Sequence, residues 1–121
     1  MKALVVDDSR AMRTIISQML RDCGFEVAEA MHGKAALTYL DANTDTTVAL
    51  IDWTMPEMNG LELLQALKAD TRFDGMHRMM VTTESEIAQV TRAMEAGASE
   101  YVMKPFTKAA IQDKLRLLGL Q

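Results

Sequence analysis

The fold of this chain is decided by residues 3–9, which read ALVVDDS. Four apolar residues are followed by two aspartates and by a serine, a residue that often caps the start of a helix. Such a short apolar run is typical of a strand that is covered on both faces of a parallel sheet. The two aspartates then lie at the carboxyl end of a strand, where open α/β folds bind their ligands.

The same change from strand signals to helix signals recurs along the chain. Short β-type runs are predicted at residues 3–6, 26–30, 48–51, 79–81 and 101–103, and segments with the apolar spacing of helices separate them. This order predicts a single α/β domain over residues 1–121, in which five helices wrap a doubly wound, five-stranded parallel sheet. The mixed run 26–30 is expected nearer an edge of the sheet.

The helices are predicted from caps, glycines and apolar spacing. The first begins after Ser9 and ends at Gly24, and its buried stripe is expected to comprise Met12, Ile15, Ile16, Met19, Leu20 and Cys23. Cys23 is therefore interpreted as a packed thiol. The fourth helix is expected to bury Ile87, Val90 and Met94 before it ends at Gly97.

Composition excludes several classes of protein. The 121 residues are 49% hydrophobic and 25% charged, with a net charge of −4, an ordinary globular mixture without the basic face of a nucleic-acid-binding protein. The N-terminal apolar run is too short for a signal peptide or a membrane span. The single cysteine excludes an internal disulfide and favours a reducing compartment. We therefore expect a cytoplasmic protein that contacts neither membrane nor nucleic acid directly.

Polar residues follow four of the five predicted strands. Asp7 and Asp8 follow the first strand, Asp52 the third, Thr82 the fourth and Lys104 the fifth. Because the carboxyl ends of parallel strands meet at one edge, we expect these side chains to converge. Each alone has a plainer role, such as a helix cap for Asp8 or a strand end for Thr82. Their joint occurrence indicates a site.

The residue types of this cluster predict its chemistry. Three carboxylates repel one another unless a cation lies between them. Oxygen ligands favour Mg²⁺ or Mn²⁺, whereas a zinc site would require histidine or cysteine nearby. Lys104 adds one positive charge, which suits an incoming phosphoryl oxygen, and Thr82 can donate a hydrogen bond to the same group. Since a carboxylate can attack phosphorus, the cluster could accept a phosphoryl group.

Five motifs carry a resemblance to a known family. They are VVDDS (5–9), DWTMPEMNG (52–60), VTT (81–83), GASEY (97–101) and KPF (104–106). Together they resemble the receiver domain of bacterial two-component response regulators over essentially the whole chain. The string Asp-Trp-x-Met-Pro is most similar to the CheY-like, chemotaxis-type branch. The resemblance implies a flavodoxin-like (βα)₅ fold with the strand order 2-1-3-4-5.

The resemblance implies a role for each acid of the predicted cluster. Asp52 would be the phosphoacceptor and, with Asp8 and the backbone carbonyl of Thr54, would ligate Mg²⁺. Asp7 would support the metal site mainly indirectly, through groups that bind the ion.

The remaining family positions imply a switch. Lys104 would contact the phosphoryl group, and its peptide bond to Pro105 is expected to be cis. Thr82 and Tyr101 would move towards the phosphoryl group and change the face made by the fourth helix, the fifth strand and the fifth helix. Thr54 and Thr83 depart from residues often found in the family, and Glu84 follows directly after Thr83. These positions are expected to tune the lifetime of the phosphoryl group.

The resemblance also implies partners. A sensor histidine kinase would donate the phosphoryl group, and the changed face would control a downstream protein. The chain would catalyse only its own phosphotransfer and slow autodephosphorylation, as a monomer that could dimerise when phosphorylated. A free-standing regulator is the simpler interpretation. The alternative is a receiver cut from a longer regulator with a DNA-binding or other effector domain.

A metal-dependent phosphatase with an aspartate nucleophile is a more remote alternative. Phosphatases of the haloacid dehalogenase type need Asp-x-Asp after the first strand. Here Asp7 and Asp8 are adjacent, and the candidate nucleophile Asp52 follows the third predicted strand. Steady turnover of a phosphomonoester would favour this alternative.

Overall fold

The computed structural model describes residues 1–53, 55, 58–83 and 88–121, in which strands and helices alternate. The strands are β1 (Lys2–Val6), β2 (Glu26–Ala30), β3 (Val48–Asp52), β4 (His77–Thr82) and β5 (Glu100–Met103). The helices are α1 (Arg10–Asp22), α2 (Gly33–Ala42), α3 (Gly60–Lys68), α4 (Val90–Glu95) and α5 (Lys108–Leu117), with a short 3₁₀ helix η1 (Thr71–Phe73). No helix within these described ranges is long and apolar enough to cross a membrane.

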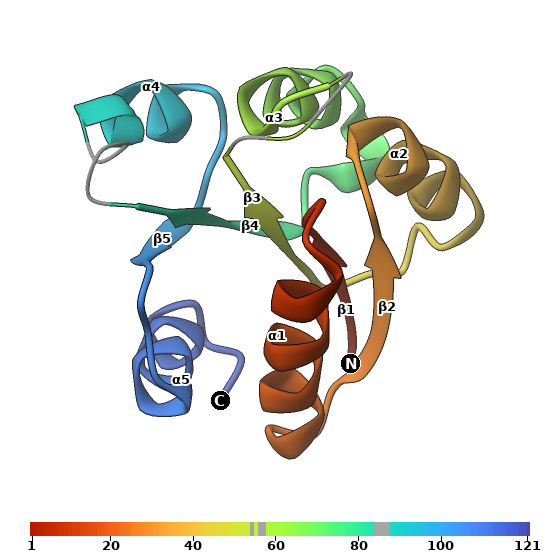
Figure 1. The fold of residues 1–121 in the computed structure, drawn as a ribbon. Helices are drawn as coiled ribbons and strands as arrows, with labels where there is room; N and C mark the ends of the chain where they lie inside the picture. Colours follow the sequence, from red (N-terminus) through yellow and green to blue (C-terminus); the bar gives the residue numbers. More distant parts are fainter. Residues whose placement is uncertain (54, 56–57, 84–87) are drawn as a thin grey trace.

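The five strands form one parallel sheet in the order β2-β1-β3-β4-β5. The predicted flavodoxin-like order is therefore confirmed, and β2 lies at an edge, as its mixed sequence indicated. Figure 1 shows α2, α3 and α4 on one side of the sheet and α1 and α5 on the other. Because the strands are parallel, the segments that follow them leave at the same edge of the sheet.

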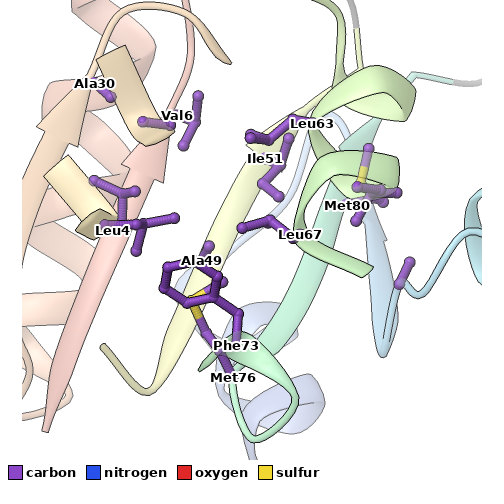
Figure 2. Packing of buried hydrophobic residues seen from close by; sticks show 14 of the residues in the cluster. Leu4, Val6, Ala30, Ala49, Ile51, Leu63, Leu67, Phe73, Met76 and Met80 are labelled. Atoms are coloured by element: carbon purple, nitrogen blue, oxygen red, sulfur yellow. The ribbon is translucent and has the colours of Figure 1, made fainter. Parts of the chain in front are cut away.

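The core has two parts because successive residues of a strand point to opposite faces. On one face Leu4 and Val6 pack in the same cluster as Ile51, Leu63 and Leu67, and Figure 2 shows this packing. On the other face the buried cluster comprises Ala3, Val5, Val48, Leu50, Met79 and Val81 from the strands, Ile16 and Leu20 from α1, and Ile111 and Leu115 from α5. Strands β1, β3 and β4 are thus apolar on both faces, as the predicted runs required.

Side-chain caps fix the start of the two helices that follow the acidic strands. The Ser9 Oγ accepts a hydrogen bond from the Met12 N–H (3.2 Å) at the start of α1. Asn59 and Glu62 form a capping box at the start of α3, in which each side chain accepts a bond from the other residue's backbone N–H. These bonds satisfy backbone donors that a helix start otherwise leaves unpaired.

Two residues that were predicted to be buried are exposed. Ile15 is 49% exposed on α1, because the sheet covers only the narrow stripe that includes Ile16. Met94 is 43% exposed, because its neighbour Ala93 takes the buried position on the short helix α4. Both predictions were therefore wrong. Ile87, which was expected to pack with Met94, lies outside the described residues.

Gly60 is required where α3 passes over the end of β3. A Cβ at this position would lie 2.7 Å from the Asp52 carbonyl oxygen and 3.1 Å from the Trp53 Cα. Both are backbone atoms that cannot rotate away. We expect Gly60→Ala to lower the free energy of unfolding by about 1–3 kcal/mol in urea denaturation, as overpacked sites do. Gly75→Ala is the control, because nothing lies within 4 Å of its Cβ position. Equal effects of the two substitutions would contradict this account of Gly60.

A candidate metal centre at the carboxyl edge of the sheet

Asp7, Asp8 and Asp52 form an acidic cluster where β1 and β3 end. One carboxylate oxygen of each lies within 4.8 Å of the others. The two strands are neighbours that pair Val6 with Ile51, so the residues that follow this pair also come close together. Asp7 is 1% exposed and Asp52 is 7% exposed, whereas Asp8 is exposed. Little water therefore screens the repulsion between the two buried acids.

The Asp7 side chain is held at one oxygen and lacks a hydrogen bond at the other. Its Oδ1 accepts a bond from the N–H of Ser9, the N-cap residue of α1 (2.8 Å). Its backbone N–H donates to the Ala30 carbonyl at the end of β2 (3.1 Å). Its Oδ2 is buried and has no hydrogen-bond partner among the described residues. Such an oxygen is costly to bury, and a cation beside it would relieve the cost.

Lys104 reaches the cluster from the end of β5. Its Nζ lies 3.3 Å from the Asp52 Oδ1 and 3.7 Å from the Asp7 Oδ2, and the second distance is too long for a hydrogen bond. Its backbone N–H donates to the Thr82 carbonyl (2.6 Å), and its peptide bond to Pro105 is cis. One ammonium group thus faces three carboxylates. The cluster remains negatively charged.

This charge imbalance acts on Asp52. Burial raises the pKa of Asp52 from 3.8 to about 6, the negative charge of Asp7 adds to the rise, and Lys104 opposes it. Asp52 is therefore mostly ionised near neutral pH, but its ionisation costs free energy in the folded protein. Added positive charge at the cluster would lower this pKa and stabilise the carboxylate.

The donor set of the cluster fits a hard divalent cation. Its three carboxylates offer oxygen ligands, which Mg²⁺ and Mn²⁺ prefer. Within the part of the chain that the structure describes, no histidine or cysteine joins the cluster, as a zinc site would require. The Asp7 Oδ2 accepts no hydrogen bond from the described residues and has Lys104 only at 3.7 Å, and the pKa of Asp52 is raised. Added positive charge at the cluster would relieve both.

The predicted switch residues Thr82 and Tyr101 lie on the neighbouring strands β4 and β5. Thr82 is 2% exposed, and its Oγ1 has no hydrogen-bond partner among the described residues. Tyr101 is half-buried and packs against the core cluster on the side of α3. The Lys114 Nζ lies 4.8 Å from the centre of the Tyr101 ring and donates to the Glu100 Oε1 (3.2 Å). The tyrosine ring is thus in contact with both the core and α5.

An apolar groove of about 450 Å³ lies beside Lys104, between α1 and the segment that links β5 to α5. Its lining comprises Met12, Ile15, Thr83, Lys104, Pro105 and Phe106. Ile15, whose exposure the helical spacing did not predict, belongs to this groove. Lys104 lines the groove and also contacts Asp52, so the groove adjoins the acidic cluster at this residue.

Two predicted site residues are not described by the structure, and one residue at the site was not predicted from the sequence. Thr54 and Glu84, which were predicted to bind metal and to tune phosphoryl lifetime respectively, lie outside the described residues. Arg13 was not predicted, although its Nη1 donates to the Asp7 carbonyl (2.7 Å). The only signal for Arg13 is its place one helical turn after the Ser9 cap, a pattern too common to identify a site residue.

Comparison with known proteins decides the family. The model of the response regulator receiver domain matches residues 3–116. The chain belongs to this family. The receiver is 49% identical over 119 residues to the chemotaxis protein CheY1 of Helicobacter pylori, and the match covers 98% of this chain and 96% of that protein. The predicted family and its CheY-like branch are thereby confirmed.

Solved structures agree with the fold of the receiver. The chemotaxis protein CheY4 of Vibrio cholerae matches it with a TM-score of 0.88 and 30% identity, over 96% of each chain. A protein described as a probable two-component system response regulator/GGDEF domain protein matches with a TM-score of 0.92 and 27% identity, over 99% of this chain but 50% of that one. The same fold thus occurs both in chains of about this length and within longer ones.

Family membership establishes the general nature of the site. CheY-like receivers are signalling switches of phosphorelays rather than classical enzymes. Receiver domains bind Mg²⁺ at an acidic pocket, and this receiver has an aspartate cluster where β1 and β3 end. CheY-like receivers take a phosphoryl group from a histidine kinase and act on a downstream target.

The raised pKa of Asp52 predicts how stability depends on pH in the absence of metal. Folding raises this pKa from 3.8 to about 6, so the folded protein binds more protons than the unfolded chain between these values, and its stability falls as pH rises through them. We expect Asp52→Asn, measured by urea unfolding in EDTA, to stabilise the protein by up to about 3 kcal/mol near pH 7.5 and by little near pH 4.

Asp22→Asn is the matched control for this measurement, because the Asp22 side chain is 45% exposed and lies far from the cluster at the other end of α1. It should change stability by less than about 0.5 kcal/mol at either pH. A stabilisation by Asp52→Asn that does not depend on pH would contradict the electrostatic explanation.

Proposed function

We propose that Asp52 accepts a phosphoryl group from a sensor histidine kinase in an Mg²⁺-dependent reaction, and that the receiver then controls a partner protein in chemotaxis-type signalling. The observation that carries this proposal is the contact of Lys104 with a buried Asp52 inside an all-oxygen cluster. The similarity to proteins that are named chemotaxis proteins supports the type of pathway. A cytoplasmic location, expected from the sequence, is part of the same proposal.

In the proposed reaction an Asp52 carboxylate oxygen forms a bond to phosphorus while the phosphorus–nitrogen bond of the donor phosphohistidine breaks. The electron pair of the broken bond stays on the imidazole nitrogen, which then takes a proton from solvent. Asp52 must be ionised to attack, and its pKa of about 6 leaves it mostly ionised near neutral pH. When bound, Mg²⁺ would be held by Asp8, Asp52 and the Thr54 carbonyl, with Asp7 in support, and would supply positive charge to the transferring oxygens.

Lys104 is suited to bind the phosphoryl group once it is attached to Asp52. Its ammonium group now faces the Asp52 Oδ1 at 3.3 Å, with a second acid, Asp7, 3.7 Å away. Forming the acyl phosphate removes the charge of the Asp52 carboxylate and adds a phosphoryl group of higher charge. The ammonium group can then donate to phosphoryl oxygens.

Thr82 is suited to carry the change away from the cluster. Its buried Oγ1 has no partner among the described residues, so a new bond to a phosphoryl oxygen would satisfy a donor that now lacks one. Thr82 pairs across the sheet with Met103, two residues after Tyr101. Movement of Thr82 and Tyr101 would alter the face made by α4, β5 and α5, and we propose that the downstream protein binds there.

The apolar groove beside Lys104 supports a protein as the phosphodonor. A small donor such as acetyl phosphate has only a methyl group to bury, whereas the groove presents Met12, Ile15 and Phe106 next to the acidic cluster. Burial of such side chains by a kinase domain would hold its phosphohistidine beside Asp52. Neither nucleic acid nor membrane is needed in this scheme. We propose a monomer that could dimerise when phosphorylated.

The natural context of the receiver is open to a direct test. We propose a free-standing regulator, in keeping with the 96% coverage of the Helicobacter pylori relative. The alternative, a receiver joined to an effector domain, has a parallel in the response regulator/GGDEF domain protein. The length of the natural reading frame distinguishes the two.

Phosphorylation can be followed with Trp53, which is 8% exposed and adjoins Asp52. Mg²⁺ with acetyl phosphate should add one phosphoryl group to the wild-type chain, detected by mass spectrometry, and Mg²⁺ with beryllofluoride should change the Trp53 fluorescence. Asp52→Ala should abolish both responses because the acceptor carboxylate is gone. Asp45→Ala, at an exposed acid paired with Lys2, should leave both responses intact.

Labelling that persists in Asp52→Ala would overturn the assignment of the acceptor. Steady release of phosphate from a phosphomonoester at many turnovers per chain would instead favour the phosphatase alternative. Slow loss of the label from wild-type protein agrees with the proposed switch, which catalyses only its own dephosphorylation.

A further inference from the structure

Arg13 connects α1, the loop of residues 7–9 that carries Asp7 and Asp8 (the acidic loop) and the edge strand β2, yet the proposed reaction gives it no role. Its side chain is 12% exposed. The Nη1 group donates to the Asp7 carbonyl at 2.7 Å, and the Nε group lies 3.4 Å from the Glu29 Oε1. The guanidinium therefore contacts the backbone of the acidic loop and a carboxylate outside the cluster.

The bond to the Asp7 carbonyl determines the plane of one peptide group. That carbonyl and the Asp8 N–H belong to the same peptide unit, which is planar. The Asp7 N–H is already held by the Ala30 carbonyl at 3.1 Å. With Arg13 holding the carbonyl, the backbone is fixed on both sides of the Asp7 Cα, and the direction in which the chain enters Asp8 is fixed with it.

Asp8 depends on this backbone more than the other two acids do. Its side chain is exposed, and within the described part of the chain it makes no hydrogen bond or ion pair that could orient its carboxylate. Asp7, in contrast, is oriented by the Ser9 N–H, and Asp52 by Lys104. What keeps an oxygen of Asp8 within 4.8 Å of the other acids is therefore the backbone from which it projects.

Glu29 reduces the positive charge that Arg13 adds near the acidic cluster. Because Glu29 pairs with the guanidinium, the two charges largely cancel, and Arg13 adds little to the positive charge that Lys104 supplies. The ion pair itself is partly exposed and weak. The charge-assisted bond to the carbonyl is the stronger interaction, and the pair with Glu29 holds the guanidinium in line for it.

We propose that Arg13 is a positioning residue for the metal centre: it orients the Asp7–Asp8 peptide so that the Asp8 carboxylate faces Asp7 and Asp52, and Glu29 anchors it. This inference rests on the proposed binding of Mg²⁺ by the cluster. It assigns to Arg13 no contact with the ion or with the phosphoryl group.

The test is Mg²⁺ binding by the full chain without any phosphodonor, measured by isothermal titration calorimetry and by Trp53 fluorescence. Arg13→Met keeps an unbranched apolar stem but removes the guanidinium donors, and we expect it to weaken Mg²⁺ binding about tenfold, the lower end of the range for groups that orient metal ligands. Arg13→Lys keeps one donor and should recover part of this loss. Arg10→Met is the control, because Arg10 is an exposed arginine on the same helix.

Glu29→Gln provides a second arm of the test. It should weaken binding by roughly twofold, since only a partly exposed ion pair is lost. In Arg13→Met the same substitution should have no further effect, because Glu29 acts through Arg13. Additive losses in the double variant would overturn the anchoring role of Glu29.

Stability measurements separate positioning from a merely structural role. Urea unfolding of each variant is compared in EDTA and in saturating Mg²⁺. A positioning role predicts that the stabilisation by Mg²⁺ shrinks in Arg13→Met. Equal destabilisation in both conditions, with unchanged Mg²⁺ affinity, would overturn the inference. Should Arg13→Met fail to fold, Arg13→Lys and Glu29→Gln decide the question by the same two measurements. Absence of Mg²⁺ binding by the wild-type chain would refute the proposed metal site itself, a result distinct from any effect of Arg13.

Discussion

Three carboxylates repel one another at the edge of the sheet, and a single ammonium group opposes this repulsion. The rest of the structure must hold them together. Asp7 and Asp52 are nearly inaccessible to water, so their charges are poorly screened, and burial raises the pKa of Asp52 to about 6. The repulsion would move the carboxylates apart if the backbone of β1 and β3 could shift. It cannot, because β1 and β3 are packed on both faces by two continuous apolar clusters. The free energy of core packing thus holds the acids together.

The turns that follow the strands keep the acids at the edge of the sheet. Ser9 both caps α1 and donates to the Asp7 carboxylate, so the helix start and the acid position depend on one residue. Gly60 allows α3 to pass within contact of the Asp52 carbonyl. Arg13 holds the carbonyl that precedes Asp8. Each acid is therefore positioned by a local feature of the chain that follows it or covers it.

The same imbalance explains how the site can act as a switch. Any group that changes the charge beside Lys104 changes the forces on β5, and the partnerless hydroxyl of Thr82 offers a second connection to β4. A small free-energy change at the cluster can thus shift the balance between two arrangements of the neighbouring strands.

The sequence by itself determined the strands, their polar ends and the family, because short apolar runs, strand-end acids and motifs such as Lys-Pro-Phe are local in the chain. It also predicted that Asp7, Asp52 and Lys104 would converge, since parallel strands share one edge. Only the tertiary structure decided that Lys104 lies 3.3 Å from Asp52, that Ile15 is exposed in a groove, and that Arg13 joins Glu29 to the acidic loop. These features depend on how the helices pack on the sheet, because that packing brings together residues from different segments of the chain.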